Sequence, residues 1–135
     1  MKALLHTDGG SRGNPGPSGS GAVLFDADGA VMDEATKFLG TATNNVAEYT
    51  AIIIGLQMAK RHGVKDLTVR MDSELAVKQL TGHYRVKNPT LASLFLQVKK
   101  LEHQFPRVRY EHVRREKNTA ADALVNRVLD AALRG

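Results

Sequence analysis

The sequence predicts an α/β fold in which a five-stranded mixed sheet is flanked by helices. Strand-length apolar runs separated by turn residues fill the first part of the chain, up to residue 39. Beyond that point, helical apolar spacing alternates with two short strand-like runs. The order of elements is therefore β-β-β-α-β-α-α-β-α. The first three strands should pair antiparallel, and the last two, reached through helical crossovers, should lie parallel to the first.

The strands follow from apolar runs bounded by glycine, proline and polar residues. The Asp-Gly signal at 26–29 predicts a hairpin between the second and third strands. The third strand is the least hydrophobic and carries Asp33, Glu34 and Lys37, which is typical of a sheet edge. The expected strands are 2–7, 20–26, 30–39, 66–71 and 107–113.

The helices follow from apolar spacing near 3.6 residues and from glycine or proline stops. The first has few polar positions and should be mostly buried, with Asn44 or Asn45 as its N-cap. The last has an amphipathic stripe that begins at Ala121. The expected helices are 46–62, 74–80, 89–105 and one that starts near Thr119.

Composition points to an ordinary globular protein, which we expect to be a single domain over residues 1–135. There is no cysteine, which excludes disulfides and thiolate metal sites. No membrane-length apolar run or signal peptide is evident, so we expect a cytoplasmic protein, monomeric and without an obligate protein partner. Nineteen Lys and Arg against 14 Asp and Glu give a net charge of +5, concentrated in the second half, which favours a polyanionic partner.

One stretch organises the rest of the chain. The first strand is expected to end at Asp8, which then leaves the sheet for a loop of glycine, proline and small polar residues, 9–17. A carboxylate in that position is held by a stiff element and faces open space. The glycines allow another backbone or a ligand to come close.

Three further acids are predicted at element ends that this topology brings to the same side as Asp8. Asp72 follows the fourth strand, while Glu48 and Asp122 fall in the first turns of two helices. Taken singly, each acid is explained by turn chemistry, capping or the helix dipole. Together they would repel one another unless divalent cations lay between them. Ligands that are all oxygen favour magnesium or manganese, and four of them suit two ions that clamp a phosphodiester during hydrolysis.

Four segments resemble the successive motifs of type 1 ribonucleases H, in order and over nearly the whole chain. They are Thr7-Asp8-Gly9-Gly10-Ser11-Arg12-Gly13-Asn14-Pro15-Gly16, Asn44-Asn45-Val46-Ala47-Glu48, Asp72-Ser73-Glu74 and Asn118-Thr119-Ala120-Ala121-Asp122. The resemblance implies a ribonuclease H-like fold that cleaves the RNA strand of RNA–DNA hybrids endonucleolytically. It also implies two Mg²⁺ ions, with Mn²⁺ as an alternative, and products with 5′-phosphate and 3′-hydroxyl ends.

Residue by residue, the resemblance makes Asp8, Glu48, Asp72 and Asp122 the catalytic, metal-binding acids. It assigns Thr43 to a phosphate of the DNA strand. The residues implied to contact the minor groove and 2′-hydroxyls are Ser11, Asn14, Asn44 and Glu74, and Asn118 is a further substrate-binding candidate. Asn and Ser side chains can both donate to and accept from a 2′-hydroxyl, although Ser11 and Asn14 could instead only stabilise the turn.

The sequence departs from the family pattern in two places. Many members carry a His in the loop before the last catalytic Asp, whereas residues 114–118 contain none; Arg115 is the candidate replacement, able to hold a phosphate but not to act as a base. His112 lies in a strand pattern and is interpreted as structural. Many members also insert a basic arm containing Trp after the second helix, which is missing here. Hybrid binding should then depend on other cations, with Lys78, Arg85 and Lys87 as candidates.

Other functions fit parts of the pattern. A non-catalytic hybrid-binding module would not need all four acids. An integrase-like or resolvase-like nuclease would cut a duplex without ribonucleotides. An actin-like ATPase also has Asp-x-Gly after its first strand but needs two such domains, more than 135 residues supply.

Overall fold

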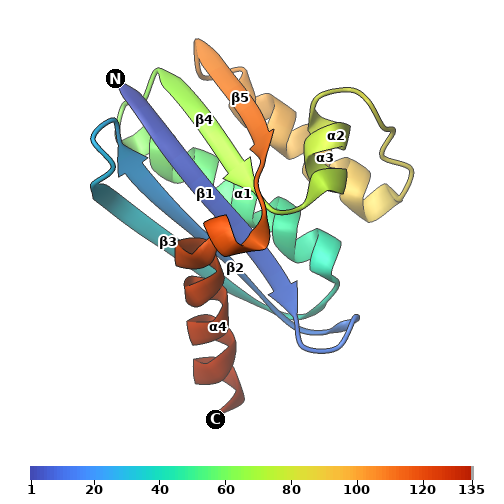
Figure 1. Ribbon diagram of the computed structural model, residues 1–135. Coiled ribbons are helices and arrows are strands. Elements are labelled where there is room, and N and C mark those ends of the chain that lie inside the picture. The colour runs from blue at the N-terminus through green and yellow to red at the C-terminus, as the bar shows by residue number, and fades with distance from the viewer. Residues whose placement is uncertain (135) are drawn as a thin grey trace.

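The computed structural model describes residues 1–134 and contains a five-stranded mixed sheet flanked by helices (Figure 1). The strands are β1 (Lys2–Ser11), β2 (Gly16–Asp26), β3 (Val31–Ala42), β4 (Asp66–Met71) and β5 (Arg107–His112). The helices are α1 (Asn44–Arg61), α2 (Glu74–Leu80), α3 (Pro89–Glu102), α4 (Thr119–Leu133) and the short 3₁₀ turn η1 (Arg115–Lys117). The predicted order of elements is confirmed.

The strands lie side by side in the order β3-β2-β1-β4-β5. β1 pairs antiparallel with β2, and β2 with β3, whereas β4 is parallel to both β1 and β5. The third strand is an edge strand as predicted, and the fourth lies beside the first. The mixed sheet expected from the sequence is therefore the observed one.

Helices cover both faces of the sheet (Figure 1). α1 packs on one face against β1, β2 and β3, with α3 beside it, and it supplies more of the core side chains than any other element. α4 crosses the opposite face over β1, β2 and β3. Within residues 1–134, none of these helices combines the length and apolarity that crossing a membrane requires.

The first strand is longer than predicted, because Asp8 does not leave the sheet. Gly9 and Gly10 continue the antiparallel ladder with β2, opposite Ser20 and Gly19. On its other side, however, β1 pairs with β4 only as far as His6. Asp8 therefore lies inside a strand but just past the end of its parallel neighbour, which still opens it to a ligand.

The bounds of two helices also differ from the prediction. α1 begins at Asn44, capped by Thr43, whose hydroxyl accepts a hydrogen bond from the Val46 amide at 3.2 Å. Glu48 is thus the fifth helical residue rather than a member of the first turn. α3 ends at Glu102, three residues earlier than expected, because residues 103–105 form a tight turn before Pro106.

Gly9 is the point at which β1 and α1 come closest. A Cβ atom at Gly9 would lie 2.2 Å from the backbone carbon of Ala47 and 2.3 Å from the amide nitrogen of Glu48. The neighbouring Ser20 hydroxyl donates a hydrogen bond of 2.6 Å to the Ala47 carbonyl and fixes the same contact. The absence of a side chain at Gly9 therefore sets the distance between the strand that carries Asp8 and the helix that carries Glu48.

Replacing Gly9 with Ala should destabilise the fold by about 2 kcal/mol or more, because backbone atoms of α1 cannot move aside as a flexible side chain can. Gly10→Ala is the matched control, since its Cβ would meet only Val125 Cγ1 at 3.4 Å. Chemical denaturation of both variants measures the difference. Equal stability of the two variants would contradict the proposed contact.

Candidate active site

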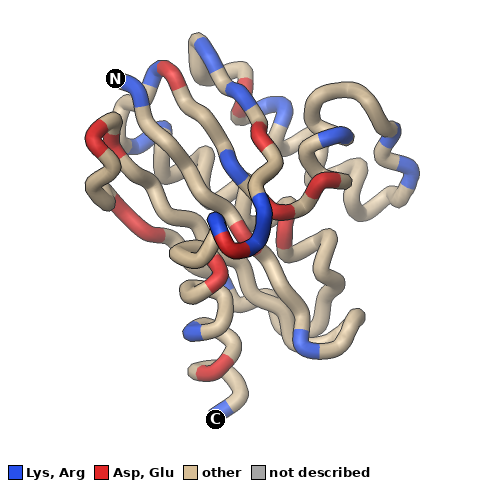
Figure 2. Tube along the Cα trace, in the orientation of Figure 1, with Lys and Arg blue, Asp and Glu red and all other residues tan. Residues whose placement is uncertain are grey.

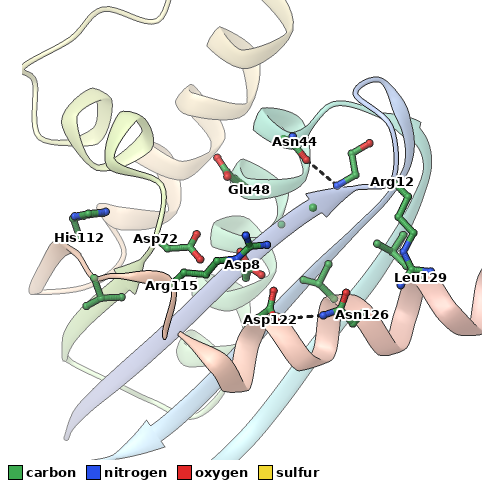
Figure 3. Close-up of a pocket in the computed structure, with 15 residues that line it drawn as sticks. Asp8, Arg12, Asn44, Glu48, Asp72, His112, Arg115, Asp122, Asn126 and Leu129 are labelled. Carbon is green, nitrogen blue, oxygen red and sulfur yellow. Dashed lines mark hydrogen bonds between the residues drawn. The ribbon is translucent and has the colours of Figure 1, made fainter. Parts of the chain in front are cut away.

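A cavity of about 490 Å³ opens beside the C-terminal end of β4 and contains all four predicted acids. Figure 3 shows Asp8, Glu48, Asp72 and Asp122 facing this cavity from four different elements. The structure thus brings together side chains that are up to 114 residues apart in the sequence, from Asp8 to Asp122. Their catalytic roles stay predictions.

Each acid is positioned by a different local feature. Asp72 follows β4 directly, and Ser73 then caps α2 through a 3.2 Å bond from the Ala76 amide. Asp122 lies in the first turn of α4, as predicted. α4 comes close to β2 at Gly21, the strand partner of Asp8, where an added Cβ would lie 2.8 Å from Leu124 Cβ. Glycine therefore allows close helix packing on both faces of the sheet beside Asp8.

The cluster disfavours full ionisation of its acids. Burial raises the pKa of Asp8 to about 8, and the nearby charges of Asp72, Asp122 and Glu48 and a hydrogen bond with Asp122 add to the effect. Burial also raises the pKa of Glu48 to about 7, with a further contribution from Asp72 and an opposing hydrogen bond from Ser73. At neutral pH, with no cation present, these two groups hold protons for much of the time.

The donor set fits a hard divalent cation. It consists of carboxylate oxygens, and two of its members release their protons only near or above neutral pH, so a cation would relieve the repulsion that raises their pKa values. Over residues 1–134, no three His, Asp or Glu side chains are already grouped as ligands of one ion. The fit therefore depends on the chemistry and convergence of the donors.

Most of the predicted substrate residues form one polar network between the β1–β2 loop and the start of α1. The backbone amide of Ser11 donates a hydrogen bond to Asn44 Oδ1 at 2.8 Å, and the backbone amide of Asn44 donates one to Asn14 Oδ1 at 3.2 Å. Ser11 and Asn44 line the cavity with the acids. Asn14 and Thr43 line a neighbouring hollow of about 550 Å³. These side chains organise the loop and leave polar atoms near the cavity.

Two predicted substrate residues lie elsewhere. Glu74 is exposed and forms an ion pair with Lys78 at 3.0 Å; this contact, with the positive charge of Lys78, lowers the pKa of Glu74. Asn118 has no exposed surface, and its amide donates to the Thr7 carbonyl at 2.9 Å. The prediction that Asn118 binds substrate directly is wrong for this structure, because a wholly buried side chain cannot touch a nucleic acid. It ties the segment before α4 to β1 instead.

Four basic or amide side chains border the acids. Arg115, predicted from the sequence, lines the cavity from η1, and Figure 2 shows its basic segment beside the acidic cluster. His112 is exposed and also lines the cavity, so its interpretation as a structural residue is wrong. The sequence reasoning missed Arg12 and Asn126. Asn126 lies one helical turn after Asp122, a spacing that could have indicated it, and donates to Asp122 Oδ2 at 3.3 Å.

Comparison with known proteins gives a consistent result. A family model described as "Reverse transcriptase-like" matches residues 6–128. The bifunctional protein Rv2228c of Mycobacterium tuberculosis is 49% identical over 133 residues, which are 98% of this chain and 36% of that protein. Ribonuclease HI of Halobacterium salinarum is 43% identical over 125 residues, 93% of this chain and 63% of that protein. The chain thus spans about a third of the first relative and under two thirds of the second.

Solved structures agree over almost the full chain. The N-terminal RNase H domain of Rv2228c from M. tuberculosis, solved as a fusion with maltose-binding protein, has a TM-score of 0.96 at 47% identity and covers 99% of this chain and 97% of that one. LC11-RNase H1 in complex with an RNA/DNA hybrid has a TM-score of 0.93 at 43% identity, covering 97% and 99%. The chain therefore belongs to the reverse transcriptase-like family, and within it to the ribonuclease HI group.

Proposed function

We propose that this protein is an endonuclease that hydrolyses the RNA strand of RNA–DNA hybrids with two Mg²⁺ ions, leaving 5′-phosphate and 3′-hydroxyl ends. The observation that carries the proposal is the convergence of Asp8, Glu48, Asp72 and Asp122 in one cavity. Its support also includes the similarity to ribonuclease HI and to a structure that contains a hybrid. Mn²⁺ is an alternative cofactor, because it favours the same oxygen ligands.

In this mechanism the four carboxylates hold the ions, and the protein supplies no nucleophile of its own. When bound, the ions would supply a lowered pKa for the attacking water and stabilisation of the departing 3′ oxygen. Asp8 and Glu48 must lose their protons for binding, so raising the pH from 6 to 9 should favour the loaded site. Arg115, which lies beside the acids in Figure 3, would bind a phosphate oxygen and orient the scissile linkage.

Selection for the RNA strand would come from side chains beside the acids. Ser11 and Asn44 offer hydroxyl and amide groups to the 2′-hydroxyls of a shallow minor groove, and Asn14 and Thr43 line the neighbouring hollow. Glu74 lies apart from them, at the start of α2. Lys78, Arg85 and Lys87 extend a basic surface along α2 and the 81–88 loop, which projects from the body in Figure 2. Tyr84 is half exposed, and the centroid of its ring lies 5.1 Å from Lys78 Nζ, so it adds an aromatic ring to that surface.

The proposal predicts that a labelled hybrid is cut in its RNA strand with Mg²⁺, and not with chelator. Asp72→Asn should reduce the rate by at least about a thousandfold while keeping the fold, since it removes one ligand of the ions. Duplex DNA and duplex RNA are the comparison substrates, and Mn²⁺ replaces Mg²⁺ in a parallel series. Cleavage of duplex DNA with sparing of the hybrid would favour an integrase-like nuclease, and hybrid binding without cleavage would favour a binding module.

The raised pKa of Asp8 predicts a pH-dependent stability in chelator. Because its folded pKa of about 8 exceeds its ordinary value of 3.8, the folded state holds the proton more tightly. That stabilisation is complete below about pH 4 and is lost as the pH rises through 8. The free energy of unfolding should therefore fall by a few kcal/mol between pH 5 and 9, at about 1.4 kcal/mol per unit of pKa difference.

Asp8→Asn should flatten this decline and be more stable than the wild type at pH 9. Asp28→Asn, an exposed acid in the β2–β3 turn, is the control and should follow the wild type. Denaturation in chelator at each pH gives the comparison. Parallel curves for the wild type and Asp8→Asn would count against a tight acidic cluster.

Arg115→Ala should lower the rate of hybrid cleavage about tenfold or more, because a charged contact to the reacting phosphate is lost. Lys117→Ala, on the same short turn but outside the cavity lining, is the matched control and should change the rate little. Single-turnover kinetics separates this effect from product release. An unchanged rate for Arg115→Ala would assign the side chain to the solvated surface.

A further inference from the structure

Arg12 projects from the turn between β1 and β2 and lines the same cavity as the four acids (Figure 3). Its backbone is firmly held. The Arg12 amide donates to the Pro17 carbonyl at 2.8 Å, and Gly16 comes so close that a Cβ there would lie 2.3 Å from the Arg12 oxygen. The turn therefore presents the guanidinium from a fixed base at the end of the cavity opposite the acids.

The guanidinium is engaged by one acid of α4. Arg12 Nη2 lies 2.6 Å from Asp130 Oδ1, and both side chains are well exposed, at 40% and 51%. Asp130 follows Asp122 and Asn126 at successive four-residue steps, so the three share one stripe of α4. Asp122 and Asn126 line the cavity together with Val125 and Leu129, and Asp130 lies beyond them on the same stripe, in contact with Arg12.

The spacing matches a nucleic-acid backbone. Eight helical residues separate Asp122 from Asp130, about 12 Å at a rise of about 1.5 Å per residue. Four strand residues separate Asp8 from Arg12, about 13 Å at about 3.3 Å each. One strand of a duplex carries a phosphate about every 3.4 Å of axis. For a hybrid whose axis runs along α4, Arg12 therefore lies roughly three or four phosphates from the catalytic cluster.

The chemistry of the ion pair allows exchange. A guanidinium binds carboxylate and phosphate with the same forked geometry, so a phosphate oxygen can replace Asp130. Exposed ion pairs contribute little net stability, and the pair is therefore easily opened.

Building on the proposed function, we propose that Arg12 binds a backbone phosphate three or four nucleotides from the scissile bond. In the free protein Asp130 holds the Arg12 guanidinium in position, and the phosphate replaces Asp130 when the hybrid binds. Asp130 then lowers the affinity for the hybrid by competing for the guanidinium. The two residues together determine how strongly this end of the cavity binds the hybrid.

A double-mutant cycle tests this exchange. All proteins carry Asp72→Asn so that the labelled hybrid is not cut, and binding is measured over a range of salt concentrations. Arg12→Ala should weaken binding about fivefold and reduce the slope of log affinity against log salt by about one. Asp130→Asn should tighten binding about threefold, and should have no effect when Arg12 is already Ala.

Equal tightening by Asp130→Asn with and without Arg12 would overturn the proposal, because it would show only a general loss of negative charge. A second arm replaces single phosphates of the hybrid with neutral methylphosphonates. A methylphosphonate at one position, three or four linkages from the cut, should abolish the effect of Arg12→Ala. If a methylphosphonate abolishes that effect at no position, the proposal is also overturned. Should the protein without Asp72→Asn fail to cleave the hybrid, the proposed function falls, while the cycle, run on duplex DNA as well, still decides the role of Arg12.

Discussion

The close contact between β1 and α1 at Gly9 is the constraint on which the site depends. It places the backbone of Ala47 and Glu48 directly against the strand that carries Asp8, at a distance that no side chain would permit. Gly21 permits a similar approach of α4 on the opposite face. Two helices are thus held against the same short stretch of sheet, and each delivers one acid to the point where β4 ends.

That arrangement concentrates negative charge where water is scarce. Burial is the largest cause of the raised pKa of both Asp8 and Glu48, and the neighbouring acids add to it. The free protein accommodates the cluster by holding protons, and the loaded protein would do so with cations. Arg12, Arg115 and Asn126 line the same cavity. In the proposed mechanism they would contact the substrate or orient the acids, and the carboxylates alone would hold the cations.

Much of the fold could be predicted from the sequence, because periodicity and turn residues report local structure directly. The order of elements and the parallel pairing of β4 with β1 are examples. The end of β1 could not be predicted, since glycine usually interrupts a strand, whereas Gly9 and Gly10 stay paired because β2 offers small partners. Thr43 caps α1 in place of Asn44 or Asn45, and the side chain and backbone amide of Asn44 bond across the loop instead.

The four acids could be predicted because each lies near a turn or a helix start that the sequence marks, but the residues around them needed three-dimensional contacts. In the sequence Asn118 is typical of an exposed loop. In the structure its side-chain amide donates a hydrogen bond to the Thr7 carbonyl. His112 continues an apolar strand pattern, yet β5 ends at the edge of the sheet and leaves it exposed. The partner of Arg12 is 118 residues away, beyond the reach of any local pattern.

The central claim is that the acids share protons when free and exchange them for divalent cations. Proton release on titration with Mg²⁺ measures this directly, by calorimetry at pH 7 in buffers of different ionisation enthalpy. The pKa values of about 8 for Asp8 and about 7 for Glu48 predict that roughly one proton leaves as the site fills, and fewer at pH 9. Binding of Mg²⁺ with no proton release at pH 7 would contradict the account.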